Sequence, residues 1–169
     1  MKYTLIRTDR RTLNLHIKEG VIIVRAPRKA PQELIDNFLE KHKSWIEKAL
    51  LKDAKKQARF RNLTEENIAR LKSEAKDYFK SKTDEYSKLM DIKYGRITIT
   101  SAKTRFGSCS SRGNISYSYT LMLYPEYARE YVIVHELAHI LEMNHSKKFY
   151  KIISDFMPDY KERRSRLED

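Results

Sequence analysis

The chain has 169 residues, of which 40% are hydrophobic and 34% are charged, and its formal net charge is +12. This composition is typical of a water-soluble globular protein, and no apolar run approaches the ~18–20 residues that a bilayer crossing requires, so we expect no membrane insertion. Its one cysteine excludes an internal disulfide and a cysteine-rich zinc finger.

The first part of the chain predicts a small sheet followed by helices. Three β-prone runs, YTLIR, TLNLHIK and VIIVRA, predict strands over about residues 2–25 and are separated by Asp9-Arg10 and Glu19-Gly20. Apolar residues from Gln32 onward recur at helical spacing. We therefore expect an N-terminal β-unit and helix over residues 1–50 and a second region over residues 51–169, which together form one compact unit.

The middle of the chain predicts a long helix and then a second group of strands. Residues 52–90 have helical apolar spacing, and Thr64 is a suitable N-cap. The segment ITIT at 97–100 is β-prone, and the turn-rich CSSRGN between two β-prone flanks indicates a hairpin. Gly113 or Asn114 is expected to supply the positive φ of its turn.

The last third predicts two helices and an interruption. Pro125 fits the first turn of a helix, which the apolar pattern extends over residues 127–141 and which is expected to be largely buried. A final helix starts near Ser146, and Pro158 interrupts it. The elements together predict an α+β fold.

The predicted buried helix carries the sequence HELAH. His135 and His139 are ~40° apart around a helix axis, so both can reach one cation. Glu136 is rotated by ~100° and is placed to reach a water at that cation. This is the arrangement of H-E-x-x-H zinc hydrolases, in which two imidazoles hold zinc and the glutamate takes a proton from the water.

A third ligand requires a turn. His145 would lie ~280° around from His135 if the helix continued, so we expect the chain to reverse before it. Asn144 can adopt the left-handed conformation that ends a helix, and Ser146 can cap the next one. The spacing matches the longer motif H-E-x-x-H-x-x-G-x-x-H, although Glu142 occupies the glycine position and is itself a candidate fourth ligand.

A helix that carries these histidines by chance, without a metal, is the alternative interpretation. It would bury imidazoles and a carboxylate that then need other polar partners. The sequence therefore favours a zinc site with His135, His139 and His145 as ligands and Glu136 as catalytic base.

Three segments resemble one protein family. RFGSCSSRGNIS at 105–116, YVIVHELAHILEMNHSKKFY at 131–150 and the later MPDYKERRSRLE are similar to the YgjP-like metallopeptidases of the zincin group, and the β-unit with its first helix is similar as well. The resemblance implies a zincin-like fold, in which the helix carrying HExxH packs with a hairpin or sheet, and a peptidase with a protein or peptide substrate. It also implies the same three ligands and the same base.

Several residues are candidates for contacts with a substrate. In zincin-type peptidases an edge strand pairs with an extended substrate, and residues 114–119, which include Asn114, are our candidate strand. Tyr117 or Tyr119 could donate to an oxyanion or could simply pack in the core. Arg105 could face a carboxylate or phosphate, or lie on the surface. Cys109 is expected to be a small buried residue.

The positive charge leaves other functions open. It can attract nucleic acid or nucleotides, although the basic residues are spread along the chain, which favours a lysine-rich solvated surface as the explanation. A nucleotide phosphohydrolase using the same metal site and a DNA-associated protease of the SprT-like kind are therefore alternatives to a general metallopeptidase. The opening MKYTLIRTDRR lacks the apolar core of a secretory signal, so a cytoplasmic location is expected.

Overall fold

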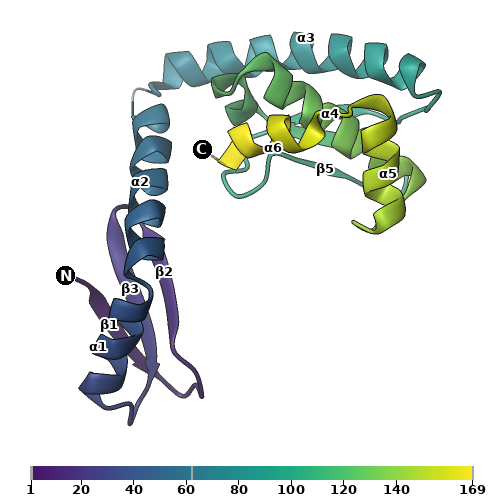
Figure 1. The fold of residues 1–169 in the computed structure, drawn as a ribbon. Helices are drawn as coiled ribbons and strands as arrows, with labels where there is room; N and C mark the ends of the chain where they lie inside the picture. Colours follow the sequence, from purple (N-terminus) through teal and green to yellow (C-terminus); the bar gives the residue numbers. More distant parts are fainter. Residues whose placement is uncertain (1, 62, 169) are drawn as a thin grey trace. The chain divides into compact units, whose positions relative to one another are not determined.

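The computed structural model describes residues 2–61 and 63–168 and has the mixed α+β fold that the sequence predicts (Figure 1). Contacts divide the chain into two compact units, here called the N-terminal unit (residues 2–61) and the C-terminal unit (Leu63–Glu168). Each unit has a hydrophobic core of its own. The sequence placed the division after residue 50, and helix α2 (Lys43–Phe60) continues past that point.

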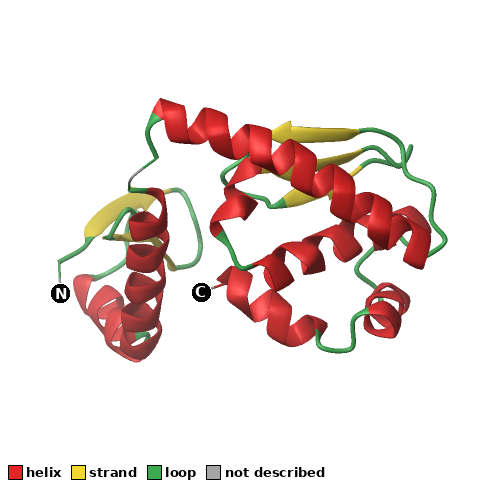
Figure 2. Cartoon of the chain, turned by 90° about the horizontal axis from the view of Figure 1, so that it is seen from above, coloured by secondary structure: helices red, strands yellow, loops and turns green. Residues whose placement is uncertain are grey.

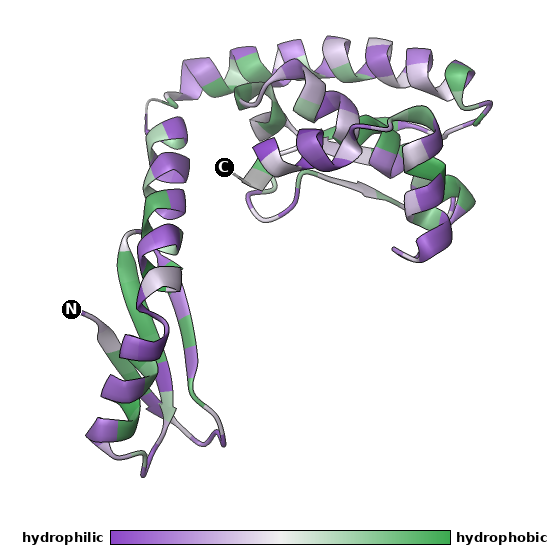
Figure 3. Cartoon of the chain, viewed as in Figure 1, coloured by the Kyte–Doolittle hydropathy of each residue, from purple (hydrophilic) through white to green (hydrophobic). Residues whose placement is uncertain are grey.

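The N-terminal unit is a three-stranded sheet with two helices. Its elements are β1 (Thr4–Thr8), β2 (Asn14–Lys18), β3 (Val21–Pro27), α1 (Gln32–Lys41) and α2. The strand order is β1-β3-β2, with β1 parallel and β2 antiparallel to β3. Figure 3 shows hydrophobic residues along most of β3, as expected of a central strand. Glu19 and Gly20 both have positive φ, which suits the two-residue turn between β2 and β3.

The C-terminal unit contains a second three-stranded sheet, with strand order β4-β6-β5. Its strands are β4 (Ile97–Thr100), β5 (Gly107–Cys109) and β6 (Ile115–Ser118). β4 runs parallel to β6, and β5 forms the predicted hairpin with β6. Gly113 has φ +71° in the hairpin turn, as predicted. Because β6 is central, both of its edges are used within the sheet.

A long helix covers one face of this sheet. α3 (Glu65–Leu89) begins at Thr64, whose side-chain oxygen accepts from the Asn67 N–H at 3.2 Å. Figure 2 shows α3 passing across the three strands. The side chains that α3 buries recur every four residues, which places them on one face. These side chains are Leu71, Ala75, Phe79 and Thr83.

Tyr117 of β6 joins the sheet to α3. Its ring is fully buried and stacks on Phe79 with the ring centroids 4.5 Å apart. Its hydroxyl lies 3.1 Å from the hydroxyl of Thr83, which is also buried. This pair satisfies two polar groups that the core would otherwise leave without a partner.

Three helices complete the C-terminal unit after a 3₁₀ turn at Tyr119–Leu123, which the sequence did not predict. They are α4 (Glu126–Leu141), α5 (Lys147–Phe156) and α6 (Tyr160–Glu168). Pro125 immediately precedes α4, and α4 is largely buried, as expected. Among the described residues, no helix combines the length and apolar composition that a membrane span needs.

We predict that Tyr117→Phe lowers the free energy of unfolding by ~1 kcal/mol, because it leaves the buried Thr83 hydroxyl without its partner. Urea denaturation monitored by circular dichroism measures the change. The double variant Thr83→Val/Tyr117→Phe is expected to recover part of the loss. Equal stability of wild type and Tyr117→Phe would contradict the assigned hydrogen bond.

Candidate metal centre

Two of the candidate ligands lie one turn apart on α4. Val132, Val134 and Leu137 are buried, so the position and rotation of this helix in the core are set by apolar packing. That rotation leaves His135 and His139 half-buried at one side of the helix. Their ring centroids are 4.9 Å apart.

The third histidine comes from the turn between α4 and α5. Figure 1 shows α5 beside the C-terminal end of α4, and the two helices are in contact. Phe149 of α5 packs against all three imidazoles, with centroid distances of 4.9 Å to His135, 4.5 Å to His139 and 4.8 Å to His145. The buried ring of Phe149 therefore contacts all three imidazoles and keeps them close together.

The chain reverses in a different way from the one predicted. Asn144 does not have positive φ; instead α4 ends because Glu142 adopts an extended conformation, with φ −146° and ψ 107°. The expected cap at Ser146 is present, since its side chain accepts from the Phe149 N–H at 3.3 Å. The carboxylate of Glu142 lies 3.9 Å from Lys148 Nζ and is not part of the group of candidate ligands.

The ligand atoms of the three histidines fit one divalent cation. One nitrogen from each of His135, His139 and His145 lies within 4.8 Å of the others. The Nε2 atoms of His135 and His145 are 3.1 Å apart. Two nitrogens that each lie ~2.0–2.1 Å from a tetrahedral zinc are ~3.3 Å apart, so this spacing suits zinc. The donor set also leaves a coordination position open, as catalytic zinc sites require.

Neighbouring groups hold two of the imidazoles in the orientation that a metal needs. His135 Nδ1 lies 3.3 Å from the Tyr131 hydroxyl, and His139 Nδ1 lies 3.2 Å from the Glu142 carbonyl oxygen. A proton on each Nδ1, donated to these oxygens, leaves Nε2 as the ligand atom. Burial, and then the charges of the two other histidines, lower the pKa of His135 to about 3. Its ring is therefore neutral at pH 7, as a ligand must be.

Glu136 is a buried carboxylate beside this group. Its residue is only 4% exposed, and Oε2 has no hydrogen-bond partner among the described residues. Burial raises the pKa of Glu136 to about 8, while the positive charge of Arg105 opposes this rise. A buried carboxyl without a partner is costly, so its position is explained better by a reacting group than by stability.

Gly107 of β5 allows this carboxylate its place. A Cβ atom at Gly107 would lie 2.6 Å from Glu136 Oε1 and 2.9 Å from Glu136 Cδ. Such distances are too short for a non-bonded contact, so only glycine fits without a shift. Sequence reasoning missed Gly107, because the chain pattern does not reveal that β5 touches α4.

A small cavity of about 270 Å³ opens beside His135 and Glu136. Its walls are mostly apolar and aromatic. The residues that complete the lining are Phe106, Gly107, Tyr131, Val132, Arg164 and Leu167. A larger cavity of about 1150 Å³ lies between α3 and β4, but none of the three histidines lines it. The chemistry of the histidine group, not cavity size, identifies the smaller cavity as the candidate active site.

The structure corrects several predictions about substrate contacts. Residues 114–119 cannot supply an edge strand, because β6 is paired on both sides. Tyr117 is fully buried and bonded to Thr83, which matches the alternative that its ring packs in the core. Tyr119 is 6% exposed and belongs to the hydrophobic core, which matches the alternative of packing. The Asn114 side chain accepts from the Arg96 N–H at 3.0 Å.

Arg105 and Cys109 are the remaining candidates from the sequence. Arg105 is exposed and close enough to Glu136 to affect its pKa, and it stays a candidate for contacting a substrate. Cys109 is half-buried, and burial together with the charge of Glu136 raises the pKa of its thiol to about 11. It is not part of the candidate ligand group, and a protonated thiol is a poor metal ligand.

Comparison with known proteins identifies a family. The chain matches the sequence model of the YgjP-like metallopeptidase domain in two overlapping segments, residues 11–70 and residues 52–169. This match favours neither the nucleotide phosphohydrolase nor the DNA-associated alternative. No curated protein matches the chain.

Two solved structures are similar to about half of the chain. One is the metallopeptidase zymogen of Pyrococcus abyssi abylysin, with 20% identity, a TM-score of 0.49, and coverage of 53% of this chain and 90% of that one. The other is the metallopeptidase zymogen of Methanocaldococcus jannaschii jannalysin, with 22% identity, a TM-score of 0.47, and coverage of 53% and 92%.

We predict that His139→Ala weakens zinc binding by at least about 100-fold, because it removes one of three converging imidazoles. Isothermal titration with zinc after chelator treatment measures the affinity. His16→Ala, a histidine variant in strand β2 of the N-terminal unit, is the matched control and should bind zinc as the wild type does. Equal loss in both variants would show that zinc binds elsewhere.

Proposed function

We propose that this chain, which belongs to the YgjP-like metallopeptidase family, hydrolyses peptide bonds with a zinc ion held by His135, His139 and His145 and with Glu136 as general base. One observation carries the proposal: three imidazole nitrogens within 4.8 Å of one another lie beside the buried carboxylate of Glu136, whose Oε2 has no hydrogen-bond partner among the described residues. Family membership supports the reaction class and implies a metal ion.

The residues divide the chemistry between them. A zinc ion, when bound, lowers the pKa of water towards about 7 and polarises a carbonyl group. Glu136 accepts a proton from the attacking water as the water oxygen bonds to the carbonyl carbon of the peptide. The same carboxyl then donates that proton to the amine nitrogen as the C–N bond breaks. Burial raises the pKa of this carboxyl, so its ionised form is a stronger base towards the attacking water than an exposed glutamate would be.

Strand β5 is our proposed substrate-binding edge. Ser118 N–H donates to the Phe106 carbonyl at 2.7 Å, and Ser110 N–H donates to the Asn114 carbonyl at 2.9 Å. Even-numbered residues of this segment therefore face β6, and the N–H and C=O groups of Gly107 and Cys109 point to the open edge. An extended peptide that pairs with these groups passes beside Glu136, which Gly107 contacts.

The cavity beside the histidines favours one kind of substrate side chain. Phe106, Tyr131 and Leu167 line it, so we expect an apolar residue next to the cleaved bond. A volume of about 270 Å³ accommodates a leucine or phenylalanine side chain. Arg105, near the carboxylate, is proposed to contact the substrate outside this cavity.

We predict that Glu136→Gln lowers the rate of peptide hydrolysis by about 10²–10⁴-fold while zinc remains bound, because the amide cannot accept the proton. Digestion of a peptide library followed by mass spectrometry measures the rate, and atomic absorption measures the zinc content. Glu126→Gln, an exposed glutamate at the start of the same helix, is the control. A zinc-loaded Glu136→Gln protein with wild-type activity would exclude this mechanism.

We predict that Gly107→Ala also lowers peptide hydrolysis, by about tenfold or more, because its methyl group displaces the Glu136 carboxylate or the strand edge. Zinc affinity should change little, since the three atoms nearest to the added methyl group all belong to Glu136 and not to a histidine. Ser108→Ala is the matched control, because the Ser108 side chain bonds Ser116 at 2.7 Å and lies on the opposite face of β5. Full activity in Gly107→Ala would show that the carboxylate tolerates displacement.

A further inference from the structure

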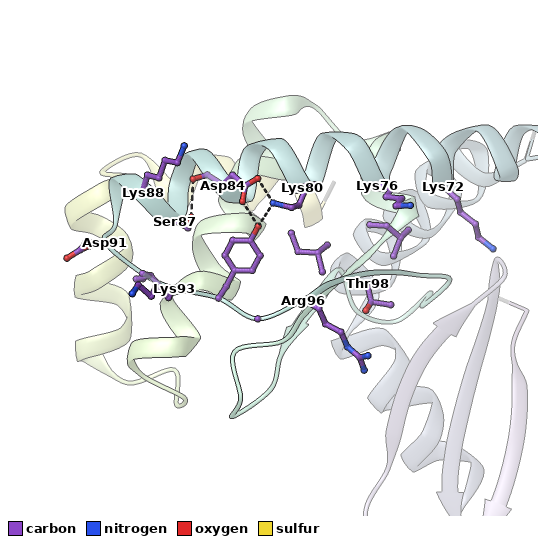
Figure 4. A pocket seen from close by; sticks show the side chains of 15 residues that line it. Lys72, Lys76, Lys80, Asp84, Ser87, Lys88, Asp91, Lys93, Arg96 and Thr98 are labelled. Carbon is purple, nitrogen blue, oxygen red and sulfur yellow. Dashed lines mark hydrogen bonds and ion pairs between the residues drawn. The ribbon is translucent and has the colours of Figure 1, made fainter.

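The larger cavity of about 1150 Å³ between α3 and β4 in the C-terminal unit, here called the α3–β4 groove, is distinct from the candidate active site. Figure 4 shows Lys72, Lys76 and Lys80 in succession along α3 on one side of it, with Thr98 of β4 and Arg96, the residue that precedes this strand, on the other. None of the metal-binding candidates lines it. The proposed peptidase chemistry does not account for this groove.

The helix side of the groove is positively charged. Lys72 and Lys76 are exposed, and no carboxylate of residues 2–61 or 63–168 lies within ion-pair distance of either. Lys80 differs, since it is bonded to Asp84 and lies 3.1 Å from the Tyr94 hydroxyl. Successive lysines are one helical turn apart, or ~6 Å.

The strand side of the groove offers an unpaired backbone edge. Ile115 N–H donates to the Arg96 carbonyl at 2.9 Å, which fixes the register of β4 on β6. Along a strand, the N–H and C=O groups of successive residues point alternately towards and away from the neighbouring strand. Because the Arg96 carbonyl points towards β6, the N–H and C=O groups of Ile97 and Ile99 point away from it. Within the described part of the chain, no other strand pairs with this edge.

Apolar side chains line the groove between these two sides. Ile97 and Ile99 lie in register with Ile115 and Tyr117, both of which are buried beneath α3. Both isoleucines are half-buried, and Ile92 contributes further apolar surface to the same lining. The groove thus combines main-chain donors and acceptors, apolar contacts and a row of cations.

We propose that this groove binds an extended acidic peptide of another protein, which adds to β4 as a fourth strand of the sheet. Alternate side chains of a strand are ~6.6–6.8 Å apart, close to the ~6 Å between successive lysines on α3. A peptide with acidic residues at every second position therefore places them opposite Lys72 and Lys76. Its main chain pairs with Ile97 and Ile99.

The strand edge argues against nucleic acid as the ligand. Phosphate oxygens only accept hydrogen bonds, so they are repelled by the outward carbonyls of Ile97 and Ile99. A peptide satisfies both the N–H and the C=O groups of this edge. The lysines alone would suit either an acidic peptide or a nucleic acid, and the regular alternation of N–H and C=O groups along the strand edge favours the peptide.

Fluorescence polarisation of a labelled peptide that alternates glutamate with threonine tests the proposal on the full-length protein. We expect saturable binding that weakens as salt rises. Lys72→Glu/Lys76→Glu should bind at least about tenfold more weakly. Lys48→Glu/Lys52→Glu, which reverses two exposed lysines with the same spacing on α2, should stay within about twofold of the wild type.

Two N-methylated versions of the peptide test strand addition without altering the protein. In a peptide paired with β4, every second amide N–H points towards β4 and the others point away. Methylation of the amides that point towards β4 should abolish binding, and methylation of the others should leave the affinity unchanged. Equal binding of the two versions overturns the proposal, as does equal loss in the two lysine variants. Tighter binding of single-stranded oligothymidylate than of the peptide, lost in Lys72→Glu/Lys76→Glu, also overturns it in favour of nucleic acid.

Discussion

The burial of α4 is the constraint on which the proposed active site depends. Val132, Val134 and Leu137 fix the rotation of this helix in the core, and that rotation sets the side of the helix on which His135, His139 and Glu136 lie. Phe149 then ties α5, and with it His145, to the same place. The unfavourable free energy of burying Glu136 and of partly burying His135 and His139 is offset by the apolar packing of the rest of this core.

The C-terminal sheet supplies two edges with different properties. Odd-numbered residues of β6 bond to β4 and even-numbered residues to β5, so β6 is fully used while each outer strand keeps one open side. The β5 edge lies against Glu136 through Gly107, which suits it to the proposed peptide substrate. The β4 edge lies beneath the lysines of α3, which suits it to holding a different, acidic segment.

Local features of the site and fold were predictable from the sequence. The spacing of HELAH, the Thr64 and Ser146 caps and the Gly113 turn depend only on neighbouring residues, so one chain suffices to read them. Strand order is different, because it depends on contacts between distant segments. Taking residues 114–119 as an edge strand was therefore wrong, and Gly107 went unnoticed for the same reason. Tyr117 offered no sequence signal that separates a core ring from a catalytic one.

The most direct test of the account is X-ray absorption spectroscopy of the zinc-loaded full-length protein. We expect a first shell of nitrogen and oxygen at ~2.0–2.1 Å, with the outer-shell scattering of three imidazoles. That scattering should fall to two imidazoles in His145→Ala. A sulfur neighbour at ~2.3 Å, as Cys109 would supply, would contradict the central claim that these three histidines hold the metal. The absence of imidazole scattering would contradict it as well.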